Sequence, residues 1–139
     1  MTVSLDRIRD VNGRATANNG SYVLYWMIAC RRTTSNCALE HAVALANEFD
    51  KPLVVLEALG VDYRWASDRI HQFVIQGMAD NEAEFAAAGV RYLPYIEPEP
   101  GAGDDLLAAL AQKACAVVTD EFPCFHLPGL VAAAGKRLD

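Results

Sequence analysis

Apolar and amphipathic segments alternate along the chain. Residues 22–28 and 53–59 are rich in branched, aromatic and other apolar side chains, which is typical of strands buried on both faces of a parallel sheet. Elsewhere, apolar residues recur at helical spacing. The predicted strands are 22–28, 53–59, 90–96 and 115–119, and the predicted helices are 36–49, 67–88, 104–114 and 128–134. Strands and helices therefore alternate through the whole domain.

Residues at the helix ends support these limits. Asn36 or Ser35 is placed to cap the first helix at its N-terminus, and Gly89 follows the second helix where a C-terminal glycine cap belongs. Gly135 can close the last helix. The apolar face of the second helix consists of Ile70, Phe73, Val74, Met78 and Phe85.

The alternation predicts an α/β fold, because neighbouring parallel strands need a right-handed helical crossover. We expect a Rossmann-like, doubly wound parallel sheet with strand order 3-2-1-4 and helices on both faces. Residues 1–21, with a short helical candidate at 5–9, form a lead-in, and residues 22–139 form the domain. The sequence stops after a helix, where another strand would continue the pattern, so we expect a truncated domain without its fifth strand. The open sheet edge also offers a place for a homodimer contact.

Composition narrows the class of protein. The 139 residues are 53% hydrophobic and 22% charged, as expected for one globular domain. The longest apolar run, residues 22–30, is about half the length of a transmembrane helix, and no basic segment leads into an apolar stretch at the N-terminus. We therefore expect no membrane contact and a cytoplasmic location. The four cysteines lack zinc-site spacing and are expected to be free thiols.

The charge balance argues against one class of partner. The chain has 12 Lys and Arg residues against 18 Asp and Glu residues, a net charge of -6. Proteins that bind nucleic acid usually carry the opposite excess, because cations neutralise the phosphates. We expect no direct DNA binding by this chain.

The carboxyl ends of the predicted strands define a candidate crevice. In an open α/β sheet, ligands bind where the strand order reverses, here between the first and fourth strands. One wall of this crevice is predicted to contain Met27, Ile28, Cys30, Arg31 and Arg32. The other wall is predicted to contain Thr119, Asp120, Glu121 and Phe122, with Glu57, Ala58 and Leu59 behind.

Each polar candidate has a structural alternative. Glu57 either lines the crevice or reaches solvent at the end of its strand, since burying an unpaired carboxylate is costly. Asp120 either orients a ligand hydroxyl or caps a loop. Arg31 and Arg32 either bind a phosphate or carboxylate, or are solvated or paired with acidic neighbours.

Several kinds of chemistry have no support in the sequence. No Gly-x-Gly-x-x-Gly follows the first strand, and no Walker motif is present. His41, His71 and His126 are scattered, with no evident nucleophile or metal-ligand partner. We therefore assign no catalytic residue and no metal site.

A set of short segments has a recognisable combination of residues. These segments are 22–27, followed by Ala29 and Arg32, and then 38–42, 46–48, 51–55, 69–73, 76–78 and 117–120. Together they resemble the N-terminal α/β domain of class II cyclobutane pyrimidine dimer photolyases, and the resemblance spans roughly residues 5–134. Class II enzymes usually carry Gln where Arg31 precedes Arg32, so this departure suggests a divergent bacterial photolyase-related branch.

The resemblance implies an antenna or scaffold domain of a light-dependent DNA repair protein. In that family this domain can hold a chromophore such as 8-hydroxydeazaflavin, FMN or a folate. Met27, Ile28, Leu59 and Phe122 would supply apolar walls, and Glu57, Arg32 and Asp120 would orient the ligand.

The resemblance further implies a C-terminal helical domain whose FAD splits the pyrimidine dimer, and we expect that domain to be absent from this sequence. That domain would be the partner of this chain, which is expected to be inactive alone. The competing hypothesis is a stand-alone Rossmann-like nucleotide-binding or interaction module.

Overall fold

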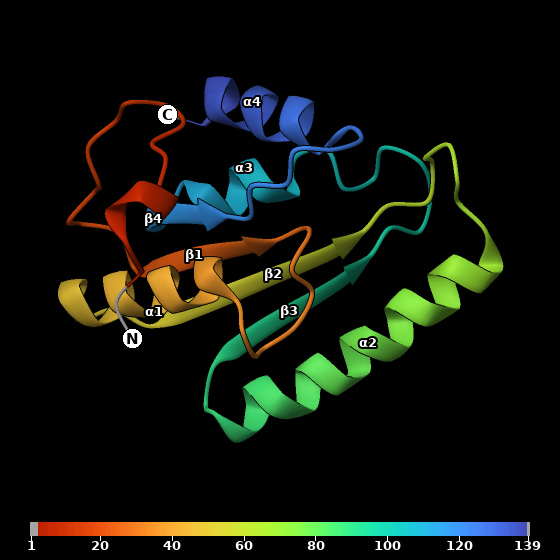
Figure 1. The fold of residues 1–139 in the computed structure, drawn as a ribbon, viewed down its shortest axis with the longest axis horizontal. Coiled ribbons are helices and arrows are strands. Elements are labelled where there is room, and N and C mark those ends of the chain that lie inside the picture. Colours follow the sequence, from red (N-terminus) through yellow and green to blue (C-terminus); the bar gives the residue numbers. More distant parts are fainter. Residues whose placement is uncertain (1–2, 139) are drawn as a thin grey trace.

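The computed structural model describes residues 3–138 and places four strands in one parallel sheet, ordered β3-β2-β1-β4 (Figure 1). The predicted fold class and strand order are therefore confirmed. The strands are β1 (Tyr22–Met27), β2 (Leu53–Leu59), β3 (Arg91–Ile96) and β4 (Ala114–Thr119). The helices are η1 (Leu5–Arg7), α1 (Cys37–Phe49), α2 (Asp68–Ala87), α3 (Leu106–Ala111) and α4 (Leu127–Arg137).

Two cores hold the helices against the sheet. On one face, Tyr25 and Met27 of β1 pack with Leu39 of α1 and Phe85 of α2. On the other face, Leu24 and Trp26 belong to a cluster against which side chains of α3 and α4 pack. Alternate residues of β1 thus enter opposite cores, which explains why this strand is apolar without interruption. Figure 1 shows the helices on both sides of the sheet.

Three details of the predicted elements are wrong. Ala114 begins β4 instead of ending the preceding helix, and Gly135 lies inside α4 instead of closing it. In α2, Met78 and Phe85 are buried, but Phe73 is 78% exposed. Only the C-terminal half of α2 packs closely on the sheet, so the helical spacing of the apolar residues overstated the buried face.

The lead-in turns onto the start of β4 before it enters β1. The backbone N–H of Ala17 donates to the carbonyl of Cys115 at 2.8 Å, and that of Ser21 donates to the carbonyl of Lys113 at 2.7 Å. At Gly20, a Cβ atom would lie 2.4 Å from the backbone nitrogen of Cys115. The close approach of the two backbones therefore requires glycine.

We expect Gly20→Ala to lower the free energy of unfolding by about 2–3 kcal/mol, because the added methyl group meets main-chain atoms that cannot rotate away. Urea unfolding monitored by circular dichroism measures this change. Gly77→Ala is the control: a Cβ atom at this position in α2 would have no neighbour within 4 Å, so the substitution should add about 0.5–1 kcal/mol through helix propensity. Equal unfolding midpoints for Gly20→Ala and the parent would contradict the expectation.

None of the helices within residues 3–138 combines the length and the apolar character needed to cross a lipid bilayer.

Candidate functional site

The structure divides the predicted site residues between two regions at the carboxyl edge of the sheet. The first region is a groove of about 940 Å³ beside β4, and its lining includes Cys30, Arg32, Thr119, Asp120 and Glu121. The second region is a hydrogen-bonded network around the end of β2, which contains Arg31, Glu57 and Ala58. The predicted single crevice is thus two separate regions.

The groove follows the outer edge of β4 and is bordered by three other parts of the fold. Trp26 and Val117 line it from the sheet, and His41 lines it from α1. Val131 contributes from α4, and residues of the lead-in complete the lining. Its volume lies within the usual range for small-molecule sites, about 300–1,000 Å³.

Phe122 borders a neighbouring pocket of about 300 Å³. This pocket shares Arg9, Glu121 and Val131 with the groove. Arg9 and Glu121 form an exposed ion pair at 2.8 Å, which lies where the two hollows adjoin. Phe122 therefore borders the region predicted from the sequence, although it does not line the groove itself.

Two predicted apolar walls are not available to a ligand in this structure. Met27 is fully buried and packs in the core beneath α1, and Leu59 is 4% exposed. Their assignment as ring-contacting walls is wrong, because alternate residues at a strand end point into the two cores and only some reach the edge. Ile28 contributes its backbone N–H to Asp120 and is half-buried.

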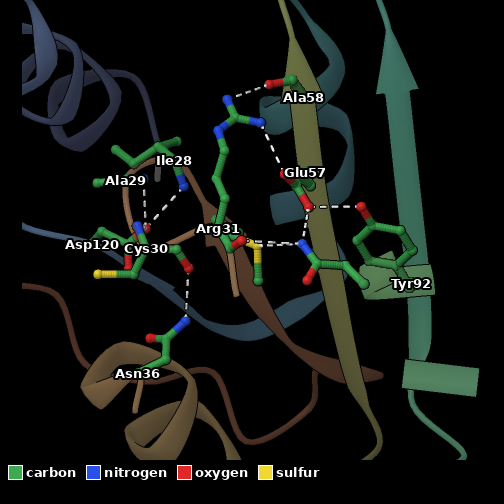
Figure 2. A network of polar contacts seen from close by, with 11 residues as sticks. Ile28, Ala29, Cys30, Arg31, Asn36, Glu57, Ala58, Tyr92 and Asp120 are labelled. Carbon is green, nitrogen blue, oxygen red and sulfur yellow. Dashed lines mark hydrogen bonds and ion pairs between the residues drawn. The ribbon is translucent and has the colours of Figure 1, made fainter. Parts of the chain in front are cut away.

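Asp120 is the best-connected of the predicted residues in the groove. Its Oδ2 atom accepts hydrogen bonds from three consecutive backbone N–H groups, those of Ile28 (3.0 Å), Ala29 (2.8 Å) and Cys30 (3.0 Å), as Figure 2 shows in part. Its Oδ1 atom accepts from the hydroxyl of Tyr25 at 2.8 Å. Asp120 directly follows β4, but the loop that it caps is the one after β1.

Tyr25 and Asn36 extend this contact to the N-terminus of α1. The Nδ2 atom of Asn36 donates to the Tyr25 hydroxyl and to the carbonyls of Cys30 and Arg32, each at 2.9 Å. Its Oδ1 atom accepts from the backbone N–H of Leu39, so the predicted N-cap is confirmed. Burial, followed by the nearby Asp120 carboxylate, raises the pKa of Tyr25, which keeps its hydroxyl protonated. Sequence reasoning missed Tyr25 because it lies within an apolar run.

Glu57 is 1% exposed and does not reach solvent. Its Oε1 atom pairs with Nη1 of Arg31 at 3.1 Å, and its Oε2 atom accepts from Nδ2 of Asn81 at 2.9 Å and from the Tyr92 hydroxyl at 2.7 Å. Arg31 also donates to the carbonyl of Ala58 at 2.9 Å (Figure 2). Of the sequence alternatives for Arg31, pairing with an acidic neighbour is therefore the one observed.

Arg32 lies against its own loop and lines the groove. Its Nη2 atom donates to the carbonyl of Ser35 at 3.0 Å, and its Nε atom donates to the carbonyl of Thr34 at 3.1 Å. Arg32 remains exposed, so its charge faces the groove and the solvent. Burial raises the pKa of the neighbouring Cys30 thiol, with a further contribution from Asp120. Within residues 3–138, no group of three His, Cys, Asp or Glu side chains is arranged to hold a metal ion.

Comparison with known proteins shows that this chain is similar to part of a photolyase. No family model matches the chain. The chain is 36% identical over 118 residues to the deoxyribodipyrimidine photo-lyase of Methanothermobacter thermautotrophicus, and the match covers 85% of this chain. It covers 26% of that relative, so the chain spans about a quarter of the length of the protein it matches. The name of this relative specifies no photolyase class, so the class II and bacterial assignments stay predictions. The chain is therefore similar to the N-terminal region of this photolyase.

Proposed function

We propose that this chain is the N-terminal α/β domain of a photolyase-like protein of the class II branch, and that it binds an antenna chromophore or acts as a scaffold. The similarity along 85% of the chain supports this proposal. The whole protein would use light and FAD to split cyclobutane pyrimidine dimers. FAD and the DNA-binding surface would belong to a C-terminal helical domain, which is the proposed partner of this chain.

The groove beside β4 is the proposed antenna site. Trp26 and Val117 offer apolar surface, while Arg32 and Thr119 offer polar groups beside it. A groove that combines apolar surface with polar groups suits a planar ring such as 8-hydroxydeazaflavin, FMN or a reduced folate. An antenna transfers excitation energy through space, so this function needs no general acid, base or metal.

The competing nucleotide-binding module is less well supported by the geometry. A nucleotide phosphate on this fold usually binds to the loop after β1 and to the following helix N-terminus. Here Asp120 occupies the loop N–H groups, and Asn36 caps α1.

The antenna proposal predicts saturable binding of at least one of the three chromophores to the 139-residue chain. Fluorescence titration should give a dissociation constant below about 1 mM, which corresponds to roughly -4 kcal/mol. We expect Phe122→Ala to weaken binding severalfold, because it removes an aromatic side chain from the smaller pocket that shares Arg9, Glu121 and Val131 with the groove. Phe73→Ala, at an exposed phenylalanine on α2, is the control and should bind as the parent does.

If none of the three chromophores binds with a dissociation constant below about 1 mM, the antenna role is contradicted and only the scaffold role remains. Equal affinity for Phe122→Ala and the parent would mean that the ligand does not contact the smaller pocket that Phe122 borders, and would contradict this part of the proposal.

We also expect the chain alone not to repair DNA. Its 139 residues form the α/β domain and leave none to build a helical FAD site, and its net charge of -6 disfavours DNA binding. The assay illuminates a dimer-containing oligonucleotide with the chain and added reduced FAD. Restoration of thymine above a control with flavin alone would contradict this expectation.

A further inference from the structure

Three consecutive backbone N–H groups converge on one point at the end of β1. These groups, of Ile28, Ala29 and Cys30, are here called the β1 amide triplet. All three lie 2.8–3.0 Å from the same oxygen, Oδ2 of Asp120 (Figure 2). Successive backbone N–H groups that point to one place form a cavity for an anion. The arrangement is therefore an anion-binding site that already contains an anion from the chain itself.

This site lies where parallel α/β folds commonly bind a phosphate. In parallel α/β sheets the loop after the first strand and the N-terminus of the following helix are the groups that bind a ligand phosphate. In this chain both are already in use, the loop by Asp120 and the helix N-terminus by Asn36. Asp120 is 3% exposed and also lines the groove, so it lies between the groove and the triplet.

An incoming phosphate would meet two obstacles at this point. It would have to displace a carboxylate that is covalently part of the chain and already holds four hydrogen bonds. It would also be placed beside that like charge in a poorly solvated position, where repulsion is weakly screened. Tyr25 opposes any rotation of the carboxylate, because it donates to the second oxygen at 2.8 Å.

We propose that Asp120 is a specificity-determining residue that fills the β1 amide triplet and excludes phosphate and other anionic ligand groups from the end of β1. A ligand in the groove can therefore place uncharged or cationic atoms at this point, but no anionic group. Removal of the Asp120 carboxylate would convert the triplet into a site for a free anion. This inference goes beyond the proposed function and does not depend on any chromophore, so its tests use only small anions.

The first test uses the parent chain. Nuclear magnetic resonance of the ¹⁵N-labelled protein follows the amide signals of Ile28, Ala29 and Cys30 during titration with inorganic phosphate at constant pH and ionic strength. We expect the three signals to stay where they are. A concerted, saturable shift of all three would overturn the proposal, because it would show that phosphate reaches the triplet despite Asp120.

The second test restores the missing carboxylate from solution. In Asp120→Ala, sodium formate should raise the melting temperature by about 3–5 °C more than sodium chloride of equal ionic strength, as expected for a ligand that binds only the folded state. The triplet signals should shift at the same time. The parent chain should melt at the same temperature in both salts. If the variant is unfolded in chloride, formate should restore its folded circular dichroism spectrum.

A matched control separates this effect from a general response to formate. Asp10 also accepts two backbone N–H groups, those of Asn12 (3.2 Å) and Gly13 (2.8 Å), but it lies in an exposed turn. Water can replace its carboxylate, so Asp10→Ala should respond equally to formate and chloride. Asp120→Asn keeps the shape and lacks the charge, and it should melt below the parent. A lack of formate-specific recovery in Asp120→Ala, or parent-like melting of Asp120→Asn, would overturn the proposal.

Discussion

Glu57→Ala should lower the free energy of unfolding by about 3–4 kcal/mol, because removing one partner of a buried ion pair leaves the other groups without compensation. The carboxylate is 1% exposed and is bound by Arg31, Asn81 and Tyr92. Arg31 is 29% exposed and can regain part of its hydration, but the Asn81 amide is buried and loses a hydrogen-bond acceptor. The loss of this acceptor accounts for much of the expected effect.

Urea unfolding of two variants separates charge from hydrogen bonding. Glu57→Gln keeps an oxygen acceptor of the same size, so it should lose about 1–2 kcal/mol, less than Glu57→Ala. Glu121→Ala removes an exposed carboxylate from its ion pair with Arg9 and should cost at most about 1 kcal/mol. If Glu57→Ala is no more destabilised than Glu121→Ala, the network around Glu57 contributes little to stability.

The strand order of this domain could be predicted from the sequence because the determining features are local. The uninterrupted apolar runs indicate central parallel strands, and β1 and β2 are indeed the two inner strands. The limits of α4 and the exposed half of α2 could not be predicted in the same way. They depend on how far each helix overlaps the sheet, and hydrophobic spacing does not report that overlap.

The site residues illustrate a different limit. For the charged residues at the carboxyl ends of strands, the sequence leaves a ligand-binding role and a structural role open, and in the structure Asp120 and Glu57 both hold loops of the chain itself. Glu97, at the end of β3, does the same: it accepts the backbone N–H groups of Val61, Gly101 and Gly103. These bonds, that of Val61 first, lower the pKa of Glu97.

Asp120 and Glu97 share a pattern, because each accepts three backbone N–H groups of loops, whereas Glu57 is bound by side chains. The carboxyl edge of a parallel sheet exposes unpaired N–H groups of the connecting loops, and a carboxylate on a neighbouring strand can satisfy several at once. The loop partners of Asp120 and Glu57 are distant in sequence: Asp120 and Ala29 are separated by 91 positions, and Glu57 and Arg31 by 26. A single sequence therefore identifies the acidic residue but not whether its partner is a loop or a ligand.

Asn36→Ala is the second substitution with a large expected effect, about 3 kcal/mol of unfolding free energy. Loss of an N-cap alone typically costs about 1 kcal/mol. Asn36 is 1% exposed, and its amide also donates to Tyr25, Cys30 and Arg32. Alanine would leave the Arg32 carbonyl without this donor, and it would reduce the Tyr25 hydroxyl and the Cys30 carbonyl to their bonds with Asp120 and the Arg32 N–H, which adds about 1–3 kcal/mol.

The chain provides a control that has the capping contact and little else. Ser67 caps α2 through a bond from the backbone N–H of Ile70 to its hydroxyl at 3.3 Å, and it is exposed. Ser67→Ala should therefore cost only about 1 kcal/mol. The difference between the two variants, measured by urea unfolding, isolates the contribution of the Asn36 amide to the loop after β1. Because this loop carries Cys30 and Arg32 into the groove, hydrogen exchange should also accelerate at residues 28–36 in Asn36→Ala but not in Ser67→Ala. Equal losses in stability, with no change in exchange at the loop, would mean that Asn36 only caps α1 and does not order this wall of the groove.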